Sequence, residues 1–148
     1  MTRRIPRNKK EPEARVKRLP ANAGNAVESQ PGRISFSFHF LNLNHEKFNI
    51  DSRPTQYFIK LMDRIKGISG METSQFIGHS DQALRCHPIK WDGTTEKSFG
   101  IPNEDTIVDV PRQFSISANK HGRVHGFLIE NVFYVVWLDP DHRLYSKQ

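Results

Sequence analysis

The alternation of apolar and polar residues is clearest in the last third of the chain, residues 113–145. Phe114 and Ile116 alternate with serines, and a β-branched and aromatic run fills residues 132–138. Alternation with a period of two, and runs of this composition between turn residues, are typical of β-strands. The segment therefore predicts three successive antiparallel strands.

The turns between these strands predict how the strands pair. With Glu130-Asn131 as the tip of a hairpin, the last two strands pair so that one face is wholly apolar. Their predicted pairs are Leu128 with Phe133, Gly126 with Val135, and Val124 with Trp137. A three-residue loop, Lys120-His121-Gly122, precedes the hairpin, and Gly122 supplies a positive φ. This loop pairs Ala118 with Val124 and Ser117 with His125, and it places Phe114 and Ile116 on the apolar face.

The opposite face of the hairpin then carries the polar side chains, because side chains alternate along a strand. Its members are Arg123, His125, Phe127 and Tyr134. A shift of one residue would move Trp137 and Phe133 into solvent and Arg123 into the core. The pattern therefore predicts that the core and the polar chemistry lie on separate faces.

The earlier part of the chain predicts a strand and a helix. Apolar and polar residues alternate over 34–43, which indicates a half-buried strand. Pro54 or Thr55 opens a helix that runs to about Gly67. The apolar stripe of this helix consists of Tyr57, Phe58, Leu61, Met62, Ile65 and Ile68.

Further elements complete the predicted fold. A shorter helix is expected over 73–79, and residues 87–91 are expected to form an edge strand that contains Pro88. Residues 92–112 show no sustained period and form a long excursion. The element order is thus β-α-α-β-β-β-β. We expect an α+β domain in which an antiparallel sheet of about four to five strands packs on two helices.

The positive charge of the chain lies at its N-terminus. Residues 1–33 hold nine of the 22 Lys and Arg residues against three Glu, which accounts for the whole net charge of +6. Residues 34–148 carry 13 charges of each sign. We expect 1–33 to be a disordered basic tail, because its few apolar residues cannot offset its ordering entropy, and 34–148 to be one domain. The tail is either an arm that binds RNA or a solvated segment.

Composition limits the size of the folded domain and the cellular location that we expect for the protein. A chain of 148 residues with 36% hydrophobic residues suits one small soluble domain. Its apolar runs are too short to span a membrane, and no apolar segment follows MTRRIPRNKK as a secretory signal requires. The single cysteine, Cys86, cannot form an intramolecular disulfide, which favours a reducing, cytoplasmic location.

The element order and the C-terminal residues resemble the RelE/YoeB-type toxin family, the small ribonucleases of bacterial toxin–antitoxin systems. The resemblance covers about residues 34–145. It is most specific where Gly122-Arg123-Val124 enters the hairpin and where His142-Arg143-Leu144-Tyr145 follows the last strand. YoeB-type members show a similar arginine-led strand and a closing His-Tyr pair. The chain departs from the family in the spacing of His142 and Tyr145, the long 92–112 segment, the tail and the neutral folded part.

The resemblance implies a metal-independent endoribonuclease without a cofactor. Its substrate would be mRNA, free or on the ribosome, and its inhibitor a separately encoded antitoxin. In such cleavage a ribose 2′-OH attacks the adjacent phosphate, which requires a base, an acid and a cation. The candidate catalytic residues are Arg123 for the phosphorane charge, His125 and His142 for proton transfer, and Tyr145 for proton transfer or base stacking. Lys120, His121, Arg143 and Tyr134 are expected to line the substrate path.

Each of these residues also has an ordinary structural explanation. Arg123 and His125 could be solvent-facing strand residues, His142 a turn residue and Tyr145 a packing residue. A second functional class is a non-enzymatic RNA- or protein-binding adaptor from a mobile element or defence system. Its contacts would be Phe127 and Tyr134, unless 92–112 covers these rings.

A metal site is the other alternative within the same residues. His121, His125, Cys86, His87 and His142 offer suitable ligand types. However, His121 and His125 would share a face only on a helix, and a turn and strand are predicted there. We therefore expect no metal.

Overall fold

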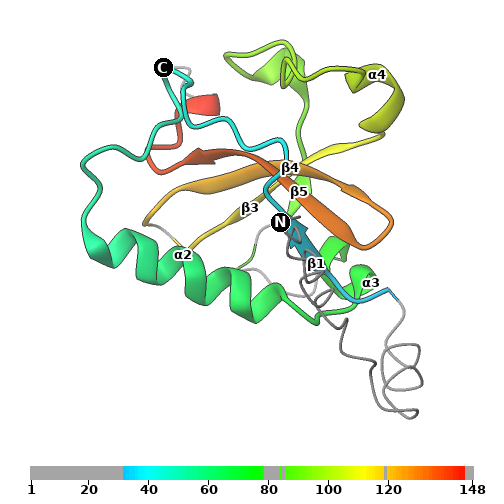
Figure 1. The fold of residues 1–148 in the computed structure, drawn as a ribbon, viewed down its shortest axis with the longest axis horizontal. Helices are drawn as coiled ribbons and strands as arrows, with labels where there is room; N and C mark the ends of the chain where they lie inside the picture. Colours follow the sequence, from blue (N-terminus) through cyan, green and yellow to red (C-terminus); the bar gives the residue numbers. More distant parts are fainter. Residues whose placement is uncertain (1–31, 79–83, 85, 119, 146–148) are drawn as a thin grey trace, which may run out of the picture. The chain divides into compact units, whose positions relative to one another are not determined.

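A mixed five-stranded sheet forms the centre of the folded unit (Figure 1). The structure is a computed structural model that describes residues 32–78, 84, 86–118 and 120–145. The strands are β1 Ser35–Ser37, β2 His87–Pro88, β3 Pro111–Ser115, β4 Arg123–Ile129 and β5 Val132–Asp139, in the spatial order β1-β5-β4-β3-β2. Neighbouring strands are antiparallel except β1, which runs parallel to β5.

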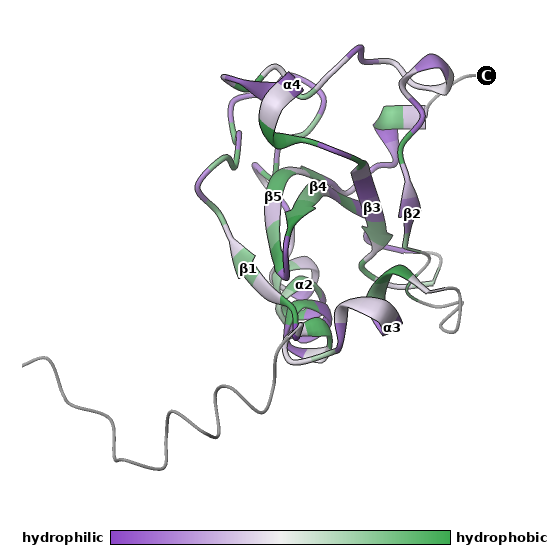
Figure 2. Cartoon of the chain, turned by 90° about the vertical axis from the view of Figure 1, so that its right-hand side faces the viewer, coloured by the Kyte–Doolittle hydropathy of each residue, from purple (hydrophilic) through white to green (hydrophobic). Residues whose placement is uncertain are grey.

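Helical elements lie on both sides of this sheet (Figures 1 and 2). Helices α2 (Thr55–Ile68) and α3 (Thr73–Ile77) lie on one side, and α4 (Glu104–Ile107) lies on the other. Two 3-10 turns, Trp91–Gly93 and Arg143–Tyr145, complete the described elements. The predicted α+β class is confirmed, although one strand pair is parallel and α4 lies within the expected excursion.

The described residues begin inside the segment 1–33 that was expected to be the basic tail. Residues 1–31 lie outside the described residues, but Gly32 and Arg33 belong to the folded unit. Arg33 pairs with Glu72 in an isolated antiparallel bridge, and its guanidinium donates to the carbonyl of Gly70. The fold therefore begins just before the expected residue 34.

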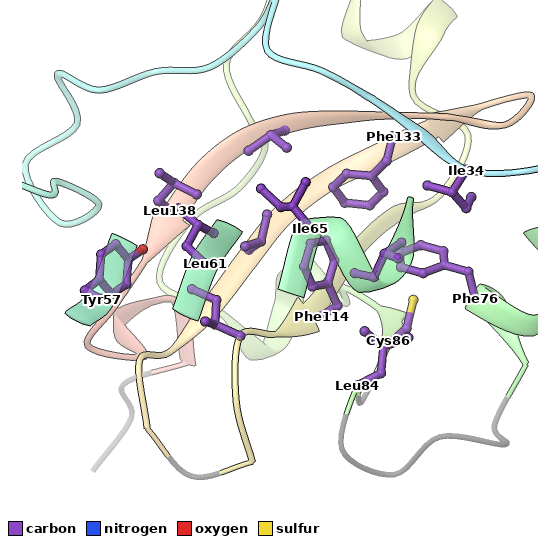
Figure 3. Packing of buried hydrophobic residues seen from close by; sticks show 14 residues of the cluster. Ile34, Tyr57, Leu61, Ile65, Phe76, Leu84, Cys86, Phe114, Phe133 and Leu138 are labelled. Atoms are coloured by element: carbon purple, nitrogen blue, oxygen red, sulfur yellow. The ribbon is translucent and has the colours of Figure 1, made fainter. Parts of the chain in front are cut away.

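The first hydrophobic core lies between α2, α3 and the sheet (Figure 3). The residues that α2 buries are Tyr57, Leu61, Ile65 and Ile68. They pack against Phe114, Val124, Phe133, Val135 and Leu138 of the strands. Most of the predicted helix stripe is thus confirmed. Met62 is an exception, since 59% of its surface is exposed on the outer side of the helix.

A second hydrophobic core covers part of the face that carries Arg123, His125, Phe127 and Tyr134, which agrees with the alternative that 92–112 covers the two rings. Its buried members are Phe48, Ile89, Phe99, Phe127, Val136, Trp137 and Leu144. The rings of Phe40 and Phe99 lie 5.8 Å and 6.0 Å from the ring of Phe127, measured between centroids. The segments before α2 and within 92–112 therefore form the cover of this face.

A β-bulge in the last hairpin accounts for part of the difference from the predicted register. Leu128 pairs with Phe133 and Gly126 with Val135, as expected. Between His125 and Gly126 the register shifts, so that His125 pairs with Trp137 and Val124 with Leu138. The extra residue, Val136, turns Trp137 and Asp139 toward the face of His125.

The turn between β3 and β4 is also longer than predicted. Phe114 pairs with Val124 and Gln113 with His125, four residues away from the expected partners. A shift by an even number keeps each side chain on its face, so Phe114 and Ile116 still join the first core as predicted. Gly122 has the expected positive φ, at 73°.

The first strand is shorter than the predicted 34–43. Phe36 contributes to the first core and Phe40 to the second, because the chain leaves the sheet after Ser37. Phe38 between them is 49% exposed. Among the described residues, no helix has the length and apolar character needed to cross a membrane.

Candidate functional site

Two rows of side chains on the second face of the sheet supply four of the residues that line a pocket. In one row, the neighbours across four strands are His87, Gln113, His125 and Trp137. In the next row, they are Ser115, Arg123 and Asp139. Residues in register on adjacent strands point to the same face, so both rows gather on one side of the sheet.

The pocket above these rows has a volume of about 630 Å³. Its ionisable and amide lining residues are His87, Lys90, Gln113, Arg123, Asp139, His142 and Tyr145. They come from four strands, from the segment after β2 and from residues 142–145 after β5. Three of the four predicted catalytic residues, Arg123, His142 and Tyr145, are thus brought into one cavity.

The Asp139 carboxylate accepts three hydrogen bonds, of which two tie the end of β5 to the 3-10 turn and one comes from β4. The donors are Nε2 of His125 at 3.0 Å, the backbone N–H of Arg143 at 2.7 Å and the backbone N–H of Leu144 at 3.0 Å. Both His125 and Asp139 are fully buried. The carboxylate therefore fixes the segment that carries the C-terminal pocket residues.

The pKa shifts of the pair favour an ionised carboxylate and a neutral imidazole. Burial lowers the pKa of His125, and the hydrogen bond and charge of Asp139 oppose this shift only in part. Burial alone would raise the pKa of Asp139, but the hydrogen bonds from His125 and the two backbone N–H groups lower it. A neutral imidazole that donates from Nε2 leaves Nδ1 as an acceptor. His125 is fully buried and is not among the residues that line the pocket.

His142 and Tyr145 reach the pocket from the turn after β5. His142 is exposed and has a left-handed backbone, with φ at 55°. Asp141 before it forms an ion pair with Arg53, which ties the turn to the segment before α2. Tyr145 is 38% exposed. Burial raises the pKa of its phenol, while the Lys90 backbone, the charge of Arg123 and the Gln113 side chain oppose the rise.

Arg123 lies between β3 and β5 at the edge of the pocket. Its guanidinium donates to the hydroxyl of Ser115 on the neighbouring strand, and its backbone pairs with Asp139 on the other side. The side chain is half-buried. A guanidinium presents five N–H donors in a planar fork that matches the geometry of phosphate oxygens.

The four predicted substrate-path residues do not line the pocket. Lys120 and His121 lie in the β3–β4 turn, where Nδ1 of His121 is 3.0 Å from the Ser117 hydroxyl. Arg143 contributes its backbone N–H to Asp139 rather than its side chain to the cavity. Tyr134 stacks on Phe127, with centroids 5.3 Å apart and planes 10° from parallel, and belongs to the second core.

Three polar pocket residues were missed as catalytic or substrate-binding candidates: His87, Lys90 and Gln113. The sequence pattern indicates His87 only as a possible type of metal ligand. Gln113 is 2% exposed, and its Nε2 lies 3.1 Å from Nε2 of His87. The pairing of β2 with β3 places His87 beside Gln113 and in the row of His125, but the two residues of β2 carry too little sequence pattern to predict it.

The structure does not bring together the residues that the metal-site alternative would need. Within the described ranges, no group of three or more His, Cys, Asp or Glu side chains is placed to hold a metal ion. Cys86 packs in the first core, and burial raises the pKa of its thiol to about 11. His87, one residue later, lines the pocket on the other face, as alternation along a strand requires.

Comparisons of the chain with protein-family models, with curated proteins and with solved structures find no match. The resemblance to RelE/YoeB-type toxins stays a prediction that rests on the element order and the C-terminal residues.

Proposed function

We propose that the protein is a toxin-like endoribonuclease that cleaves mRNA without a metal ion, and that the pocket is its active site. One observation carries the proposal: a single cavity holds two imidazoles, a guanidinium, an amine and a phenol. They belong to His87, His142, Arg123, Lys90 and Tyr145. These are the kinds of group that cleavage of a phosphodiester by its neighbouring hydroxyl requires.

In the proposed reaction, the ribose 2′-oxygen attacks the adjacent phosphorus while one histidine removes its proton. The bond from phosphorus to the 5′-oxygen of the next nucleotide breaks, and the other histidine protonates that oxygen. The products are a 2′,3′-cyclic phosphate and a free 5′-hydroxyl. His87 and His142 are assigned to the two proton transfers, since imidazoles exchange protons readily near neutral pH.

The remaining pocket residues have charge-stabilising and binding roles. Arg123 and Lys90 stabilise the negative charge that develops on the phosphorane. A guanidinium does so with paired N–H groups, and an ammonium acts as a point charge. The half-exposed ring of Tyr145 offers a surface on which a base can stack. Asp139 holds the C-terminal segment in place through its hydrogen bonds to Arg143 and Leu144, and His125 donates a third hydrogen bond to the same carboxylate.

The proposed partners are mRNA, free or ribosome-bound, and a separately encoded antitoxin. Their support is the resemblance to RelE/YoeB-type toxins. The adaptor alternative has less support, because Phe127, one of its two expected contact residues, is fully buried.

The proposal is tested with purified protein and RNA, with and without a chelator and with and without ribosomes. Cleavage that resists the chelator and leaves 2′,3′-cyclic phosphate ends is expected, and RNA with a 2′-deoxy nucleotide at the cut site should stay intact. Replacing His142 or His87 with alanine should slow cleavage by about 10²-fold or more. His39, which is exposed and outside the pocket, provides the matched control, His39→Ala.

Two results would count against the proposal in different ways. Binding of RNA without cleavage under every condition would favour the adaptor function. Cleavage at an unchanged rate in both pocket variants would show that the active site lies elsewhere. Expression of the chain alone should also arrest bacterial growth, and the His142 variant should relieve the arrest.

A further inference from the structure

The outer side of α2 carries an apolar patch that the described part of the chain leaves uncovered. Ile59 is 54% exposed and Met62 is 59% exposed, while Phe58 beside them is half-buried. These residues line a groove of about 580 Å³. Neighbouring exposed apolar side chains with a charged rim are typical of protein–protein contacts. Of the residues that line this groove, only Phe58 packs against the first core.

A polar hollow adjoins the groove and shares its rim. Lys60, Asp63 and Lys66 line both cavities. Arg64 lines the hollow as well, and its Nε donates to the carbonyl of Ile116 at 3.0 Å. Lys60, Asp63 and Lys66 form no ion pair with any other described residue. The surface thus combines an apolar centre with three cations and one carboxylate.

We propose that this surface binds an acidic amphipathic helix of another protein. Apolar residues spaced three and four positions apart on the partner would fill the groove beside Ile59 and Met62. Glutamate or aspartate residues on its flanks would face Lys60 and Lys66, where unlike charges attract and like charges repel. The inference does not depend on the chemistry of the pocket on the other side of the sheet.

Charge favours this occupant over two others. A second copy of the chain, packed α2 against α2, would bring two surfaces with the same excess of positive charge together. The N-terminal tail is also disfavoured, because residues 1–31 contain eight Lys and Arg against three Glu. Both alternatives predict behaviour that the experiment below detects.

The experiment selects helical peptides on the full-length protein. Displayed peptides of about 20 residues, long enough to form stable turns, carry leucines on one face and randomised Glu or Lys on the flanks. Acidic flanks should be enriched. The double variant Ile59→Gln, Met62→Gln should bind the best peptide at least tenfold more weakly, whereas Leu43→Gln, at a residue 47% exposed outside the groove, should bind it as before. The variant Lys60→Glu, Lys66→Glu should reverse the preference to basic flanks.

Circular dichroism checks that the variants keep their fold, which the exposure of the substituted side chains favours. The proposal is overturned if no peptide binds the native protein more tightly than the variant Ile59→Gln, Met62→Gln. It is overturned as well if the native protein selects peptides with basic flanks. It is also overturned if light scattering finds a dimer that the double variant abolishes, or if a peptide of residues 1–31 competes for the groove.

Discussion

At the scale of single residues, the buried His125 makes the free energy of unfolding depend on pH. Its imidazole is fully buried, and burial lowers its pKa below the ordinary value of 6.5. As the pH falls through about 6.5, the unfolded chain takes up a proton at this position and the folded chain does not. The free energy of unfolding should therefore decrease on acidification, by up to about 1.4 kcal/mol per pH unit.

The variant His125→Gln tests this coupling. Glutamine offers an N–H donor to Asp139 but does not titrate, so it should cost about 1–2 kcal/mol near pH 7. It should also flatten the fall in stability between roughly pH 6.5 and pH 5. Urea unfolding at a series of pH values measures both effects. The exposed residue His39 provides the control, since His39→Gln should keep the native slope; a native slope in His125→Gln would contradict the assignment.

At the scale of elements, the sequence predicted where the strands lie better than it predicted which face of the sheet each side chain occupies. Residues 132–138 are apolar or aromatic throughout, because both faces of β5 are buried. Such a run contains no polar residue to mark a change of face, so the bulge after Val135 left no signal. The second core was missed for a related reason. Its cover comes from segments without a regular period, around Phe40, Phe48 and Phe99.

The pocket was predictable only in its C-terminal half. Arg123, His142 and Tyr145 could be grouped because they flank one hairpin and the turn that follows it. His87 and Lys90 could not, since β2 has only two residues and its pairing with β3 spans a long connection. A short strand with a proline carries too little pattern to identify its neighbour.

The turn that leads into β4 depends on Gly122, which can be tested directly. A Cβ at this position would lie 1.9 Å from the carbonyl oxygen of Asp139, and the backbone has a φ of 73°. Gly122→Ala should therefore destabilise the protein by about 3 kcal/mol or more, from strain and from steric overlap together. Gly100 has the same φ, but a Cβ there would point into open space, so Gly100→Ala isolates the strain alone.

The expected cost of Gly100→Ala is about 1 kcal/mol. Denaturant unfolding of the two variants gives the comparison. Equal losses would show that the close approach between Gly122 and the end of β5 does not contribute to stability, and the tight packing of the pocket edge would need another explanation.

At the scale of the whole molecule, the sheet separates two surfaces of different character. The pocket lies on the face with the second core, and the α2 groove lies beyond the helices on the opposite face. A protein partner on α2 would therefore not cover the pocket. If both proposals hold, an acidic peptide bound at Ile59 and Met62 leaves RNA cleavage unchanged at saturating RNA.

The distribution of charge makes a separate prediction about RNA affinity. Residues 34–148 are neutral, so the chain's long-range attraction for a polyanion must come from the first 33 residues. We expect the full-length variant with glutamine in place of Arg3, Arg4, Arg7, Lys9 and Lys10 to bind RNA more weakly at low salt. The slope of log affinity against log salt should fall by up to about 0.7 for each neutralised charge that contacts RNA.

The rate of cleavage at saturating RNA should not change in this variant, because the pocket cations Arg123 and Lys90 are untouched. Lys97→Gln, at an exposed residue of the folded unit, is the control and should have little effect on the slope. Filter binding over a salt series measures affinity, and single-turnover cleavage measures the chemical step. An unchanged slope would show that the tail does not contact RNA. A slower chemical step would instead place tail residues in the active site, since electrostatic attraction alone changes binding and not the reaction of bound RNA.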